Sequence, residues 1–126
     1  MALPRNEKYL EKIYYDVVKQ GYSSVTNIAI SLNVSVSSVT KMVRKLSDEE
    51  YLEYKRYGKI QMTEKGMIKG EKLAYDYQVL EAFFQLIGMD QKHIPHEISC
   101  IKYHLSGNAI AKIRTYMSGI KNAEIR

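Results

Sequence analysis

Apolar side chains recur every three or four positions along most of the chain, which is the spacing of one buried face of an α-helix. The first such stretch covers residues 6–20 and is followed by Gly21, a residue that readily ends a helix. Its apolar positions are Leu10, Ile13, Tyr14, Val17 and Val18. We therefore expect an amphipathic helix here.

Two shorter helices are expected next, separated by a tight turn. Thr26 is a good N-cap for a helix that runs to about Leu32, and Asn33 tolerates the positive φ of a turn. Ser35 then caps a third helix over residues 36–50. Two short helices joined in this way are typical of a helix-turn-helix.

A change to alternating apolar and polar residues predicts a small β-hairpin. The stretches "LEYKR" and "KIQMT", residues 52–56 and 59–63, flank the turn dipeptide Tyr57-Gly58. Helices followed by a hairpin give the order of a winged helix-turn-helix.

The second half of the chain reads as helical. A long helix over residues 65–87 has an apolar stripe too broad for one buried face, so we infer burial against a second subunit. A helix beginning near Pro95 and closed by Gly107, and a last one from 110 to about 118, follow. Predicted dimer-interface residues are Leu73, Tyr77, Leu80 and Phe84.

The fold class expected from this order is mainly α: a winged helix-turn-helix domain over residues 1–63, followed by a helical dimerisation domain over residues 64–126. Lys and Arg together number 19 against 14 Asp and Glu, a balance that suits an acidic partner such as nucleic acid. No segment is apolar enough to span a bilayer and no signal-peptide pattern opens the chain. We expect a cytoplasmic protein without a membrane partner, and the lone Cys100 agrees with a reducing compartment.

The third predicted helix carries hydroxyls and long cations opposite its apolar stripe, which is the chemistry that reads base edges and holds phosphates. The cations of the hairpin would then grip the DNA backbone or minor groove. The predicted DNA-binding residues are Ser35, Ser37, Ser38, Thr40, Lys41, Arg44, Lys45, Lys55, Arg56 and Lys59. A solvated helix face is the alternative for the helix taken alone. Tyr54 and Tyr57 could also touch the backbone, although tyrosines in small hairpins more often pack on their own scaffold.

Four stretches, "EKYLEKIY", "SVSSVTKMVRKLSDEEYLEYKRYGKIQMTEKG", "LEAFFQLIGMD" and "IKYHLS", resemble the manganese transport regulator branch of the diphtheria toxin repressor family. The resemblance covers nearly the whole chain. It implies a homodimeric transcription regulator that binds palindromic operators in double-stranded DNA, in a family whose members do so when divalent metal occupies a site between helices. It gives no sign of the SH3-like third domain of larger members.

The metal site that the resemblance implies is largely replaced in this chain. The family places carboxylates and histidines at six matching positions, of which only Glu11 keeps a metal-ligating side chain. The matching residues are Lys8, Glu11, Tyr77, Ser99, Lys102 and Tyr103. One carboxylate cannot hold Mn²⁺ or Fe²⁺ against water, and an ammonium about 4 Å from a divalent ion is repelled by several kcal/mol even at an effective dielectric near 20. We therefore expect no metal cofactor.

Our hypothesis for the replacement is electrostatic. Lys8 or Lys102 would supply, next to Glu11, the positive charge that metal supplies in relatives, while Tyr77 and Tyr103 fill the volume. The alternative is that both lysines are ordinary surface residues. A second route to metal is a zinc site, because His96, Cys100 and His104 are spaced four residues apart along a helical stretch, although such residues are more often packed structure.

The leading functional hypothesis is thus a metal-independent DNA-binding regulator. The alternatives are a metal-responsive repressor with other ligands, and a winged-helix module whose basic face meets an acidic protein. The chain has no phosphate-binding glycine loop and no nucleophile–base grouping, so we expect neither an enzyme nor a small-molecule substrate.

Overall fold

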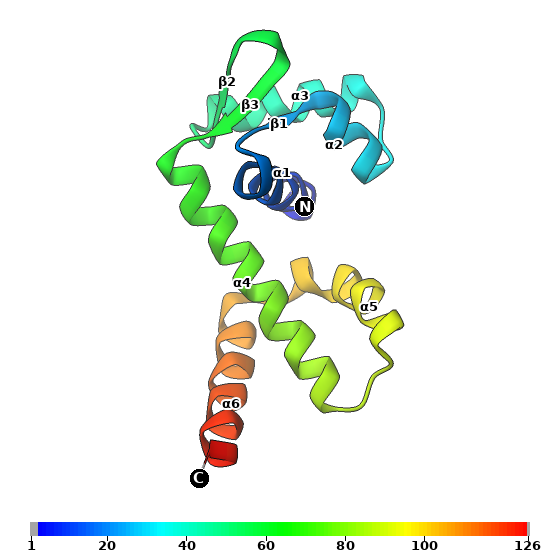
Figure 1. Cartoon of the computed structure of the whole chain (residues 1–126), viewed down its shortest axis with the longest axis vertical. Coiled ribbons are helices and arrows are strands. Elements are labelled where there is room, and N and C mark those ends of the chain that lie inside the picture. Colours follow the sequence, from blue (N-terminus) through cyan, green and yellow to red (C-terminus); the bar gives the residue numbers. More distant parts are fainter. Residues whose placement is uncertain (1–2, 126) are drawn as a thin grey trace. The chain divides into compact units, whose positions relative to one another are not determined.

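A computed structural model describes residues 3–125 of the chain (Figure 1). The elements, in chain order, are α1 (Leu3–Gln20), β1 (Ser23–Ser24), α2 (Val25–Leu32), α3 (Val36–Asp48), β2 (Leu52–Tyr54), the 3₁₀ turn η1 (Arg56–Gly58), β3 (Lys59–Met62), α4 (Glu64–Leu86), η2 (Gln91–His93), α5 (Ile94–Ile101), η3 (Lys102–His104) and α6 (Gly107–Ile125). The mainly α fold class and the winged helix-turn-helix order are confirmed.

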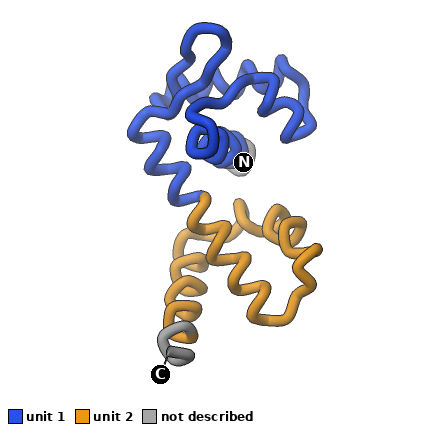
Figure 2. The backbone as a smooth tube through the Cα atoms, in the orientation of Figure 1, with its two compact units in different colours: residues 1–73 blue, residues 74–126 orange. Residues whose placement is uncertain are grey.

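The chain forms two compact units, residues 1–73 and 74–126 (Figure 2). The boundary lies inside α4, later than the division at residue 63 expected from the sequence. The reason is local packing: the first turns of α4 lie against α1, where Gly70 is pressed on the side chain of Tyr14 and Lys69 Nζ is 3.8 Å from the Glu7 carboxylate. The start of α4 therefore belongs to the first unit.

The first unit contains a three-stranded antiparallel sheet of order β1-β3-β2. Strand β1 was not predicted, because two residues are too short to show an alternating pattern. It fixes the start of α2: Ser24 is held extended and its hydroxyl accepts a hydrogen bond from the backbone N–H of Asn27. The predicted N-cap at Thr26 is thus wrong, since the strand ends directly at the helix.

A single apolar core holds this unit together. Ile13 of α1, Ile28 of α2, Val43 of α3 and Ile60 of β3 are all fully buried in it. The predicted Ser35 cap is confirmed, as is the left-handed turn residue Asn33, which has φ 55°. The core therefore fixes α3 by its apolar stripe and leaves the opposite stripe outward.

The second unit consists of the rest of α4, α5 and α6, with the intervening 3₁₀ turns. Leu80, Ile94 and Ile98 are its most deeply buried residues. The sequence predicts that Gly107 closes α5, and this is wrong. Gly107 begins α6, because the hydroxyl of Ser106 caps that helix by accepting a hydrogen bond from the N–H of Ala109. Helix α6 also continues beyond the predicted end near residue 118.

Candidate functional site

Helix α3 presents a polar, cationic surface. Its apolar stripe, Val39, Val43 and Leu46, is completely buried. The exposed cations of this helix form no ion pair with other residues that the structure describes, so their charge is available to a ligand. They are Lys41, Arg44 and Lys45. A shallow depression between Ser38, Lys41, Met42 and Lys45 lies on the same surface.

The hydroxyls at the start of α3 differ in what they can offer. Ser35 Oγ accepts from the N–H of Ser38 at 3.1 Å and donates to Ser38 Oγ at 2.8 Å. Thr40 Oγ1 donates to the carbonyl of Val36 at 3.0 Å. Ser35 and Thr40 are therefore engaged with their own helix, whereas Ser37, whose Oγ lies 3.2 Å from Ser35 Oγ, is exposed at its first turn.

The three cations of the wing, residues 52–62, also differ. Lys55 Nζ lies 3.0 Å from a carboxylate oxygen of Glu53, and Lys59 Nζ lies 4.7 Å from the centre of the Tyr22 ring. Arg56 is exposed and forms neither an ion pair nor a cation–π contact with any residue that the structure describes. Arg56 is thus the wing cation most free to reach a phosphate.

Neither wing tyrosine is packed into the scaffold. Tyr54 is half exposed, and Tyr57 is 96% exposed. For Tyr57 the structure contradicts the expectation that a hairpin tyrosine packs on its own scaffold. Sequence reasoning named Tyr57 as an alternative backbone contact but favoured packing, because nothing in the pattern distinguishes a tyrosine that packs from one that projects.

The residues at the six family metal positions are distributed between the two units. In the first unit, Lys8 of α1 is exposed and Glu11 of α1 is buried, with 7% of its surface accessible. In the second unit, Ser99 of α5 is exposed, and its hydroxyl donates to the carbonyl of His96 at 2.6 Å. The surface-lysine interpretation therefore agrees with Lys8.

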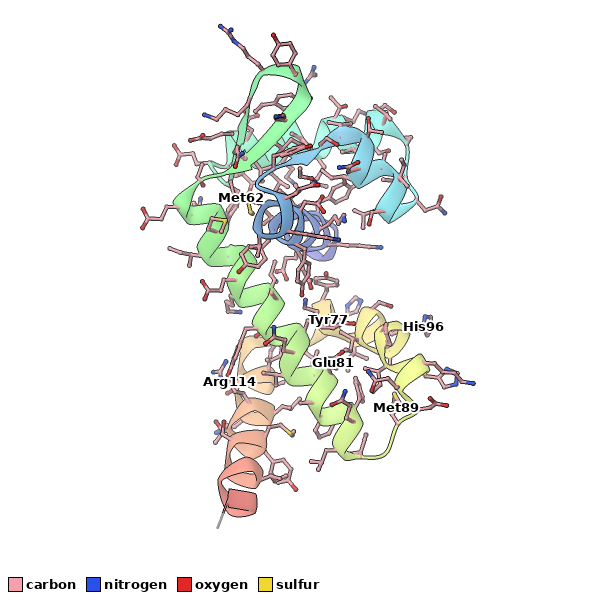
Figure 3. All side chains as sticks on the ribbon, viewed as in Figure 1. Met62, Tyr77, Glu81, Met89, His96 and Arg114 are labelled. Carbon is pink, nitrogen blue, oxygen red and sulfur yellow. The ribbon has the colours of Figure 1, made fainter. Side chains whose placement is uncertain are left out.

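Lys102 is different, because it is only 4% exposed. Its Nζ lies 5.4 Å from the ring centre of Tyr77 on α4 and 5.4 Å from that of Tyr103 in η3 (Figure 3, which labels Tyr77). An ammonium within about 6 Å of an aromatic face is attracted by the ring quadrupole. The structure thus brings three of the six positions together as a buried ammonium between two rings, and the surface-lysine interpretation is wrong for Lys102.

This cluster does not fit a divalent cation. Two phenol rings and an ammonium supply no carboxylate or imidazole, and the ammonium repels a second cation in a poorly solvated place. Among the residues that the structure describes, no three His, Cys, Asp or Glu side chains gather as metal ligands would.

The predicted zinc alternative is only partly assembled. Cys100 Sγ and His96 Nε2 are 3.7 Å apart on α5, both exposed. His104 does not continue the same helical face, because α5 ends at Ile101 and the 3₁₀ turn η3 changes the angular spacing. The helical spacing predicted from the sequence therefore fails at the end of α5.

The residues predicted at the dimer interface are mostly occupied within one chain. Leu73 lies in the core of the first unit, and Leu80 and Phe84 lie in that of the second. They leave little surface for a partner, whereas Ile68, Tyr75 and Leu86 are apolar α4 residues that remain exposed.

Comparison with known proteins gives concordant matches. The family described as "Iron dependent repressor, N-terminal DNA binding domain" matches residues 1–60. The "HTH-type transcriptional regulator MntR" of Geobacillus thermodenitrificans is 44% identical over 113 residues, which are 90% of this chain and 80% of that protein. The MntR of Bacillus velezensis is 40% identical over 126 residues, all of this chain and 89% of its own.

Solved structures agree in fold. The T. acidophilum IdeR crystal structure superposes with a TM-score of 0.78 at 23% identity, covering 89% of this chain and 53% of that one. The manganese regulator SloR gives 0.77 at 23% identity, covering 90% of this chain and 53% of its own. This chain therefore spans about half the length of these two structures. In the part of the chain that is described, no helix has the length and apolar character needed to cross a membrane.

Proposed function

The chain belongs to the diphtheria toxin repressor family, in its manganese transport regulator branch; we propose that it recognises a two-fold operator and that, unlike the metal-dependent members of the family, it does so without a divalent metal. Members of this family are transcription regulators, not enzymes. They act in the cytoplasm, dimerise and bind DNA. For this chain, we propose the mode of DNA binding and its independence of metal.

The surface of α3 supports operator recognition. In a helix-turn-helix the second helix enters the major groove, with short side chains near its start facing base edges. Ser37 and Ser38 lie at that start, and Lys41 and Lys45 follow one turn apart on the same side, where they suit phosphates or guanine edges. Thr40 contributes less, because its hydroxyl is bonded to its own helix. In a symmetric dimer two such helices reach half-sites one or more helical turns apart.

The observation that carries metal independence is the buried Lys102 ammonium between Tyr77 and Tyr103. This lysine stands at one of the six positions at which the family resemblance places metal ligands. We propose that this charge makes a divalent metal unnecessary for operator binding. Lys8 is exposed and is the weaker candidate for that role.

The test is operator binding with and without metal. Purified protein is titrated with DNA from upstream of its own gene and with random duplex, in excess chelator and again with added Mn²⁺ or Zn²⁺. We expect the same sequence-selective affinity in all series. Binding that needs metal would overturn metal independence and would direct attention to the His96–Cys100 pair.

The same titration addresses the protein-interaction alternative. A DNA-binding surface loses affinity steeply with salt, because each phosphate contact releases a counterion. It also prefers operator to random duplex. Weak binding of both duplexes at physiological salt would favour an acidic protein partner for the α3 face.

A further inference from the structure

The tip of the wing is a tight turn over residues 56–59 in an unusual sequence. Tyr57 has φ 61° and ψ 30°, and Gly58 has φ 73°. The backbone N–H of Lys59 donates to the carbonyl of Arg56 and closes this turn, and next to it the N–H of Lys55 donates to the carbonyl of Lys59 at 2.7 Å. Positive φ at both central residues defines a type I′ turn, which is the tight connection that matches the twist of a hairpin.

Tyrosine is a poor residue for the first central position of such a turn. Asn, Asp and Gly are preferred there, because a bulky L-residue in the left-handed region clashes with its own backbone. The glycine at the second position meets the requirement, whereas Tyr57 does not. The turn would therefore form more readily with Asn at position 57.

Packing does not compensate for this strain. Tyr57 is 96% exposed, the highest value among the large apolar and aromatic side chains of the described chain that remain exposed. Side chains at the tip of the hairpin extend away from the backbone (Figure 3). A strained conformation that gives its side chain no contact within the fold points to a contact outside it.

The surroundings of Tyr57 indicate what that contact is. The preceding residue, Arg56, is the wing cation that has neither an ion pair nor a cation–π contact among the described residues. In a winged helix bound to DNA, the wing lies along the sugar–phosphate backbone beside the minor groove while the recognition helix occupies the major groove. A cation followed by a projecting phenol matches that surface: the guanidinium binds phosphate, the ring packs on deoxyribose, and the hydroxyl donates to a phosphate oxygen.

We propose that Tyr57 is a DNA-contact residue that anchors the wing tip to the sugar–phosphate backbone. This inference rests on the proposed operator-binding mode. Because the backbone is chemically the same at every step, the contact adds affinity for operator and random duplex alike and adds no sequence preference. Since tyrosine is uncharged, the contact also adds nothing to the salt dependence.

The decisive variant is Tyr57→Asn, because asparagine suits the turn and removes the ring. We expect its melting temperature to equal or exceed that of the wild type, while its affinity falls roughly tenfold for both duplexes, the scale of one lost aromatic contact with nucleic acid. The slope of log affinity against log salt should stay unchanged. Tyr57→Phe should keep part of the affinity, because the ring remains.

Two companion variants give the comparison its scale. Arg56→Gln removes a phosphate contact and should reduce the salt slope by about one per subunit. Tyr116→Asn removes a similarly exposed tyrosine from α6, and with the dimer intact it should bind as the wild type does.

The outcomes separate this inference from the proposed function. Tyr57→Asn that binds both duplexes as tightly as the wild type overturns the contact, whereas a lowered melting temperature shows that the ring supports the fold and overturns the strain argument. A wild type that binds neither duplex overturns the operator proposal and this inference together.

Discussion

Replacement of Lys102 tests whether its positive charge is needed for the stability of the protein and for operator binding without metal. Lys102→Met keeps nearly the length of the side chain and removes the charge from between Tyr77 and Tyr103. Lys102→Glu keeps a charge there and reverses its sign. Lys8→Met removes one cation from an exposed position and is matched in net charge to Lys102→Met.

The free energy of unfolding should change by different amounts in the two variants at position 102. With both ring centres 5.4 Å away and only 4% of the residue exposed, each cation–π contact contributes about 2 kcal/mol. Lys102→Met loses these contacts but also relieves the desolvation of an ammonium, which is worth several kcal/mol. Its net change should stay within about 2 kcal/mol. Lys102→Glu keeps the desolvation cost and places a carboxylate against two negative ring faces, so it should lose about 3–5 kcal/mol.

The assays are thermal unfolding and operator titration, both in chelator. A loss of 3–5 kcal/mol lowers the melting temperature of a unit of this size by at least about 10 °C. If the ammonium stabilises the operator-binding state, Lys102→Met should bind operator at least about fivefold more weakly than Lys8→Met, which corresponds to about 1 kcal/mol, or half of one such cation–π contact. A double-mutant cycle with Glu11→Gln then measures whether the two charges are coupled.

The hypothesis that the Lys102 charge replaces a metal would be contradicted by the following results. The charge of Lys102 has no role in operator binding or stability if two results are found together. Lys102→Met would bind operator as tightly as Lys8→Met, and Lys102→Glu would have the same melting temperature as Lys102→Met. An additive cycle would remove Glu11 as its acidic partner and leave the ammonium–aromatic cluster as a local feature of the second unit.

Two further predictions concern the positions that orient the DNA-binding elements. Ser35→Ala removes the cap of α3, so it should lower the free energy of unfolding by about 1 kcal/mol and also weaken operator binding. Ser35→Asp should keep the cap and the stability but weaken operator binding, because its carboxylate is repelled by phosphate. Operator affinity of Ser35→Asp equal to that of the wild type would contradict this. Gly66→Ala should destabilise by about 1–3 kcal/mol, because the added methyl would collide with the carbonyl of Tyr51, which is held by Thr63. The control Gly119→Ala, whose methyl meets nothing within 4 Å, should stabilise α6 by about 0.5–1 kcal/mol, and a Gly66→Ala protein that melts no lower than wild type would refute the packing argument.

The sequence predicts the helices and the wing well because their periodic patterns report burial directly. The stripe Val39, Val43 and Leu46 is fully buried, as its spacing requires. Helix ends are predicted less well, because they depend on neighbours: Ser24 caps α2 only since β1 pairs with β3, and Ser106 makes Gly107 a beginning instead of an end.

For the candidate site, the sequence identifies residue types but not their partners. It lists three wing cations as equivalent, and only the folded hairpin separates Arg56 from Lys55, paired with Glu53, and Lys59, placed over Tyr22. It also treats Lys8 and Lys102 alike, although one is exposed and the other buried. Burial of a charged side chain depends on contacts from distant parts of the chain, which no local pattern contains.

The replacements at positions 77, 102 and 103 depend on one another physically. A buried ammonium requires a partner that compensates its lost hydration, and the two tyrosine rings supply negative faces at the distances where that attraction acts. Replacing Tyr77 by His alone would put a metal ligand beside a cation that repels metal. Replacing Lys102 by Glu alone would put a carboxylate against two ring faces without a cation between them. Metal binding at these three positions could therefore return only by changing them together, which is why we propose that the cluster is an alternative to a metal site and not a damaged one.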